Sequence, residues 1–83
     1  MNTERIINSI EKLKSEAKNG LDCFIALSGG FRSSKHIWYK EDDNTFEIIN
    51  QIDGAEQCLT EAELYTESNI GEAMQKNSLI KDL

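Results

Sequence analysis

The sequence contains no proline, a single histidine (His36), and no apolar run longer than a few residues, such as Cys23–Leu27. A helix that crosses a membrane needs about 20 consecutive apolar residues, so none is expected here. The N-terminal letters MNTERIINS hold charges and amides where a secretory signal needs an apolar stretch. We therefore expect a cytoplasmic protein with no membrane partner.

Cysteine is also scarce, because Cys23 and Cys58 are the only two and form no CxxC pair. In a reducing cytoplasm we expect two free thiols, each buried as a small apolar side chain. A zinc site would need more ligands than these two thiols and one imidazole supply. We expect neither a metal nor any other cofactor.

The chain has 83 residues, of which 39% are apolar and 29% are charged. This composition is typical of a folded globular protein, and the length allows one domain, 1–83, with a thin core. The net charge is −6, but residues 41–75 hold ten acids and no base. Residues 1–40 hold seven bases and four acids, so we expect a basic face and an acidic face unless folding mixes them.

The first segment predicts an amphipathic helix capped by Thr3 and ended by Asn19-Gly20. Its apolar residues recur at helical spacing: Ile6, Ile7, Ile10, Leu13 and Ala17. Two further helices are expected near the C-terminus. Thr60 and Glu63 match a capping box, and Ser68 is expected to cap a last helix. The residues expected to face inward there are Ile70, Ala73, Met74 and Leu79.

Three segments between these helices predict strands, namely LDCFIALS, KHIWYK and TFEIINQI at residues 21–28, 35–40 and 45–52. In the third, Phe46, Ile48 and Ile52 are expected to share one face. The letters EDDN and the pair Asp53-Gly54 predict turns. Together they predict an α+β fold of order α-β-β-β-α-α. Its antiparallel sheet has three strands, or four with a short one near Gln57-Cys58, and helices cover one face.

The stretch ALSGGFRSS resembles the SGGxDS signature of the ATP-pyrophosphatase enzymes. That resemblance implies nucleotide binding at the SGG loop, with pyrophosphate held by backbone amides. Arg32 stands where the signature has an aspartate, and an open nucleotide-binding sheet needs a longer chain. The favoured interpretation is therefore a turn in which Gly29 and Gly30 adopt positive φ, which leaves Phe31 and Arg32 at its tip. Nucleotide binding remains the remote alternative.

Residues 29–40 combine cations and aromatic rings without an acid. Aromatic and arginine side chains are enriched in protein-binding hot spots, and the same mixture on a sheet also binds single-stranded nucleic acid. The acidic net charge opposes phosphate binding, so a protein partner is favoured and nucleic acid is the alternative. The candidate partner-binding residues are Phe31, Arg32, Lys35, His36, Trp38 and Lys40.

No arrangement of residues selects a catalytic site. Cys23 and His36 fall on predicted neighbouring strands, where a nucleophile and a base could meet, but nothing distinguishes this pair from chance. We therefore expect a non-enzymatic accessory or regulatory protein that binds another macromolecule. In this hypothesis the partner is a protein, and the contact lies at Phe31, Arg32 and the outward side chains of the second strand.

Overall fold

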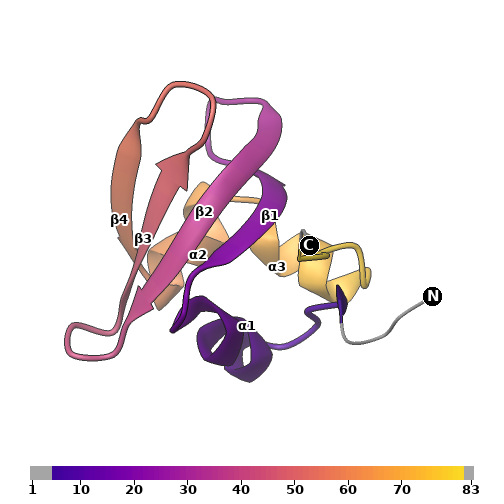
Figure 1. Cartoon of the computed structure of the whole chain (residues 1–83). Coiled ribbons are helices and arrows are strands. Elements are labelled where there is room, and N and C mark those ends of the chain that lie inside the picture. The colour runs from indigo at the N-terminus through magenta and orange to yellow at the C-terminus, as the bar shows by residue number, and fades with distance from the viewer. Residues whose placement is uncertain (1–4, 82–83) are drawn as a thin grey trace.

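One antiparallel sheet and three helices make up the computed structural model, which describes residues 5–81 (Figure 1). The sheet has the strand order β1-β2-β3-β4, and its strands are β1 (Leu21–Ala26), β2 (Arg32–Lys40), β3 (Thr45–Asn50) and β4 (Glu56–Thr60). The helices are α1 (Ile10–Ala17), α2 (Glu61–Glu67) and α3 (Ile70–Gln75). The predicted α+β fold is confirmed, and the optional fourth strand is present. None of these helices has the length and apolar character needed to cross a membrane.

The core lies between the helices and one face of the sheet. Successive side chains of a strand point to opposite faces, so every second residue of β2 is buried, from Ser33 to Tyr39. The strand register places Ile37 between Leu21 of β1 and Ile48 of β3 on this inner face. Helices α2 and α3 lie behind the sheet in Figure 1, and α1 lies across its lower end. The buried apolar residues from the helices include Leu13, Ala17, Leu64, Ile70, Ala73 and Met74.

The two edges of the sheet differ. The outer edge of β1 is covered by the C-terminal part of the chain, through isolated bridges from Cys23 to Lys81 and from Leu27 to Ser68. Asn69 completes this edge, because its N–H donates to Ala26 O at 3.1 Å and its Oδ1 accepts from Ala26 N at 2.9 Å. At the other edge, no strand among residues 5–81 pairs with the outer side of β4.

The N-terminal helix is shorter than the sequence predicted. It begins at Ile10, where the Ser9 side chain caps it by accepting a hydrogen bond from Lys12 N at 3.2 Å. The predicted cap, Thr3, lies outside the described residues. Ile7 lies outside the helix and its N–H donates to Leu79 O at 2.8 Å, while its neighbour Ile6 bridges to Ile80. This pairing with the distant C-terminal segment replaces the first helical turns, whereas Gly20 ends the helix region as predicted with φ +87°.

The third strand ends earlier than predicted, and Ile52 is not on its buried face. Asn50 closes a turn by accepting from Gly54 N at 2.7 Å, and its side chain accepts from Ile52 N at 2.9 Å. Ile52 is therefore in the turn and is 78% exposed. Phe46 and Ile48 are buried, as predicted.

Of the two predicted caps in the C-terminal part of the chain, the one at Thr60 is confirmed. Thr60 and Glu63 form the capping box that begins α2. Thr60 N donates to Glu63 Oε1 at 3.0 Å, and Glu63 N donates to Thr60 Oγ1 at 3.2 Å. The prediction that Ser68 caps the last helix is wrong, because the N-cap of α3 is Asn69, although Ser68 Oγ accepts from Ile70 N at 3.2 Å. The four residues predicted to face inward are buried, with Leu79 in the segment after α3.

Neither Cys23 nor Cys58 forms a disulfide, and only one of them is buried. Cys23 faces the core from β1. Cys58 is exposed on β4, which corrects the expectation that both would pack as apolar side chains. Its partner in the register is Glu47, whose side chain lies on the sheet face opposite to the core.

The capping box predicts a pH-dependent contribution to stability. The Thr60 backbone N–H, followed by its hydroxyl, lowers the pKa of Glu63 below its ordinary value of 4.5. Because the folded pKa is the lower one, this stability is complete above pH 4.5 and is lost as the pH falls through the folded pKa. Thr60→Ala should lower the free energy of unfolding at neutral pH by about 1 kcal/mol, measured by urea denaturation.

The difference between wild type and Thr60→Ala should narrow only slightly as the pH is lowered below 4.5, because the variant keeps the backbone N–H that is the larger cause of the lowered Glu63 pKa. Thr66→Ala is the matched control, because Thr66 lies on the same helix and its hydroxyl donates only to helix carbonyls. A Thr60→Ala variant no less stable than Thr66→Ala would contradict the importance of the cap.

Candidate functional site

The face of the sheet turned away from the helices carries most of the predicted binding residues; we call it the open face. Residues of β2 that alternate with the buried ones point to it: Arg32, Ser34, His36, Trp38 and Lys40. Each of them is at least partly exposed, and Phe31 lies beside them in the loop that precedes β2. The structure thus brings five of the six candidate residues to one surface.

Three large aromatic side chains are exposed at or beside the open face. Phe31 is 90% exposed, whereas Phe24 and Trp38 are 50% and 48% exposed. The Arg32 guanidinium lies over the Phe24 ring, 5.6 Å from its centroid, as in a cation–π contact. Phe24 belongs to β1 and lies beside Ser34 in the register, so this cluster spans two strands and a loop.

A hydrogen-bond network fixes the middle of the open face. His36 Nδ1 lies 2.8 Å from Asp22 Oδ1, so the imidazole donates to the acceptor-only carboxylate across the β1–β2 pair. Gln51 Nε2 donates to the same oxygen at 3.2 Å, and Ser34 Oγ donates to Gln51 Oε1. The network holds the His36 ring in one orientation between the aromatic side chains.

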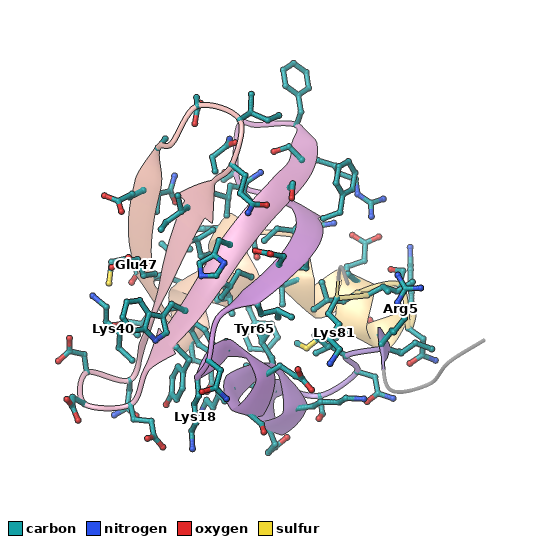
Figure 2. The ribbon with its side chains drawn as sticks, viewed as in Figure 1. Arg5, Lys18, Lys40, Glu47, Tyr65 and Lys81 are labelled. Carbon is teal, nitrogen blue, oxygen red and sulfur yellow. The ribbon has the colours of Figure 1, made fainter. Side chains whose placement is uncertain are left out.

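The cation at the far end of β2 is paired. Lys40 Nζ lies 2.9 Å from Glu47 Oε2 on β3, and both residues are labelled in Figure 2. The hydrogen bond and charge of Glu47 raise the pKa of Lys40 above its ordinary value. Lys40 therefore stays charged, but its charge is balanced within the protein.

Lys35 is not part of this surface, contrary to the sequence prediction. It is 2% exposed and points to the inner face of the sheet. The reason is strand alternation, because Lys35 has the same parity in β2 as Ile37 and Tyr39, which face the core.

The SGG loop is a turn between β1 and β2, as the favoured interpretation predicted. Gly30 N donates to Leu27 O at 2.9 Å, and Gly29 has φ +79° at the position where a type II turn favours glycine. Gly30 itself does not have positive φ, which corrects half of that prediction. Ser28 N donates to Glu67 O at 2.6 Å, so two amides that a phosphate cradle would offer are already bonded.

A hollow of about 320 Å³ lies at the lower end of the open face, between the turn after α1 and β2. It is lined by Lys18, Asn19, Gly20, His36 and Trp38. Gly20 allows the His36 ring to approach closely, since a Cβ on this glycine would lie 2.8 Å from His36 Cε1. Lys18, which is labelled in Figure 2, lies at the rim and is paired with Glu41 at 2.7 Å.

The acidic segment 41–75 is drawn into contact with bases from the first half of the chain. Lys14 pairs with Glu61 at 2.7 Å, and this contact raises the pKa of Lys14. With the Lys18–Glu41 and Lys40–Glu47 pairs, three bases of residues 1–40 meet acids of the acidic segment. Folding therefore partly mixes the two charged parts that the sequence separates.

Sequence reasoning missed Phe24 and Asp22 as members of the open face. The segment LDCFIALS was interpreted as a buried strand, although Asp22 alternates with Leu21 and Cys23 and so indicated one exposed face. Within residues 5–81, no three His, Cys, Asp or Glu side chains are grouped so that they could hold a metal ion.

A scan against protein-family models and searches among curated proteins and solved structures gave no match to this chain. The functional argument therefore depends on the geometry of its own residues.

The close contact between Gly20 and His36 gives a test of how the open face is held. Gly20→Ala should lower the free energy of unfolding by more than about 1 kcal/mol and shift the NMR signals of the His36 ring. Gly29→Ala is the matched control, because its φ is also positive but a Cβ there meets nothing within 4 Å. If both variants lose the same free energy of unfolding and the NMR signals of His36 do not shift, the contact between Gly20 and the His36 ring contributes nothing to stability.

Proposed function

We propose that this protein is a non-enzymatic accessory or regulatory protein that binds a partner protein through the open face. The observation that carries the proposal is that Phe24, Phe31 and Trp38, three large aromatic side chains, remain exposed at or beside this face, with the Arg32 guanidinium over the Phe24 ring. Large exposed apolar side chains that gather on one face of a folded domain are typical of interaction sites.

The charges of this face favour a protein partner over nucleic acid. Nucleic-acid affinity depends on unpaired cations that neutralise phosphates. Of the four predicted cations, Lys35 is buried on the other face, while His36 and Lys40 are next to Asp22 and Glu47. Arg32 is thus the one exposed cation of the predicted set that no ion pair within residues 5–81 includes.

The same geometry indicates the kind of surface that the partner presents. Apolar side chains of the partner would cover the exposed aromatic rings, and a carboxylate would pair with Arg32. Stacking of the guanidinium on Phe24 holds its donors in place, which lowers the entropic cost of forming such a pair. The contact would then have an apolar centre with one charged pair, as many protein interfaces do.

The test replaces Phe31 and Arg32 and compares the effect on partner affinity with that of replacing exposed residues of the helices. We call the first double substitution the tip variant. Tagged wild-type protein is used to capture its partner, and the affinity of the purified partner is then measured by calorimetry. Phe31→Ala/Arg32→Ala should weaken binding by at least about 30-fold, since one hot-spot residue contributes about 2 kcal/mol or more. The circular dichroism spectrum should not change, because both side chains are exposed.

Tyr65→Ala/Lys76→Ala is the matched control, because it removes an exposed aromatic residue and an exposed cation from the helices. It should leave the affinity unchanged. If the tip variant binds as tightly as this control, the proposed face is not the contact.

The nucleic-acid alternative predicts a different result. Titration with a fluorescent single-stranded oligonucleotide at two salt concentrations should show no salt-dependent binding, because Arg32 is the one predicted cation that is both exposed and outside an ion pair. Tight binding at low salt that weakens steeply at high salt would instead support nucleic acid as the partner.

A further inference from the structure

Lys35 combines a charged group with nearly complete burial. It is 2% exposed and is the largest of the fully buried side chains. Its Nζ donates to Ser33 Oγ and, at 3.3 Å, to the carbonyl oxygen of Ile25. Both partners are neutral, and no ion pair among residues 5–81 includes Lys35.

This arrangement leaves the ammonium group without a balancing charge. Lysine is almost never buried unless it is paired, because removing its charge from water is costly. An ammonium can donate three hydrogen bonds, and the described residues accept two. One donor of Lys35 therefore remains, and Ser33 Oγ, which accepts from Lys35, can still donate its own proton.

A cavity of about 360 Å³ lies beside Lys35 and Ser33, between the SGG loop and the turn that joins β3 to β4. Its size falls at the lower end of the range that holds small-molecule ligands. The apolar part of its wall comes from Leu27, Phe31, Ile52 and Ala55. Ile52, which the sequence predicted to be buried, is available for this wall because it lies in the turn.

We propose that this cavity binds a small organic anion that carries a carboxylate or phosphate group. The oxyanion accepts hydrogen bonds from Lys35 Nζ and the Ser33 hydroxyl and supplies the charge that balances the buried ammonium. The apolar body of the ligand packs against Leu27, Phe31 and Ile52. Both oxyanions offer the same acceptor chemistry to these donors, so the choice between them is left to the experiment.

One acid also lines the cavity, but its carboxylate is engaged in the turn. Asp53 Oδ1 accepts from Ala55 N at 2.9 Å, which closes the loop between β3 and β4. The cavity lies on the inner side of the sheet, whereas the proposed partner surface is the open face. Phe31 and Arg32 line the cavity and also belong to the proposed partner surface, so the test depends on Lys35 and Ser33, which belong to the cavity alone.

The experiment follows the amide NMR spectrum of the full chain during titration with benzoate, phenyl phosphate and the neutral analogue benzyl alcohol. At least one of the two anions should give saturable shifts at Ser33, Ala55 and the SGG loop. Benzyl alcohol should bind at least about tenfold more weakly, because it lacks the charged acceptor. Shifts from neither anion, or equal affinity for the neutral analogue, would overturn the proposal.

Lys35→Met tests the ammonium directly while it keeps the length of the side chain. Anion affinity should fall at least about tenfold, and the thermal midpoint should stay level or rise, because methionine is not costly to bury. Lys76→Met removes an equal charge at the exposed end of α3, where Lys76 pairs with Glu72. It should reduce the anion affinity by less than Lys35→Met does. Unchanged anion affinity in Lys35→Met would refute the assignment.

A second variant keeps the test informative if Lys35→Met does not fold. Ser33→Ala removes the other donor, and Lys76→Met again serves as the folded control. Anion affinity in Ser33→Ala should be reduced while the neutral analogue binds as in wild type. Equal losses for the anions and the neutral probe would point to a change in cavity shape and would count against the proposal.

Discussion

The alternation of side chains along the central strand β2 is the constraint on which the rest of the structure depends. Inward residues such as Ile37 and Tyr39 fill the core, while the residues between them form the open face. The same alternation places Lys35 inside and His36 outside, although they are neighbours in sequence. Because β2 pairs with both β1 and β3, its parity also fixes which side chains of those strands are buried.

Much of the fold could be predicted where the signal is local. The capping box of Thr60 and Glu63 and the end of the first helix near Gly20 depend on a few adjacent residues. Ile6 and Ile7 could not be placed in this way, because their helical spacing is overridden by pairing with Leu79 and Ile80 at the other end of the chain. The exposure of Cys58 likewise depends on the strand register of β4, which its short segment does not reveal.

The candidate site was predictable as a set of side chains on one strand, but its electrostatics were not. The sequence shows four cations within residues 32–40. Only the pairing between strands reveals that Asp22 faces His36 and that Glu47 faces Lys40. The contact between Phe24 and Arg32 also depends on strand pairing, because the whole β1–β2 turn separates the two residues in sequence. The parity of Lys35 was visible in the sequence, because it matches that of Ile37 and Tyr39.

The unequal edges of the sheet limit how the molecule could assemble with itself. Asn69 occupies both outer backbone groups of Ala26, so β1 offers no free donor or acceptor there. An extra strand can therefore be added only beside β4, the edge that the described chain leaves unpaired. Two copies joined β4 to β4 would form one continuous sheet with a covered edge at each end. Growth by edge-to-edge addition would then stop at a symmetric pair and would not continue into a fibre.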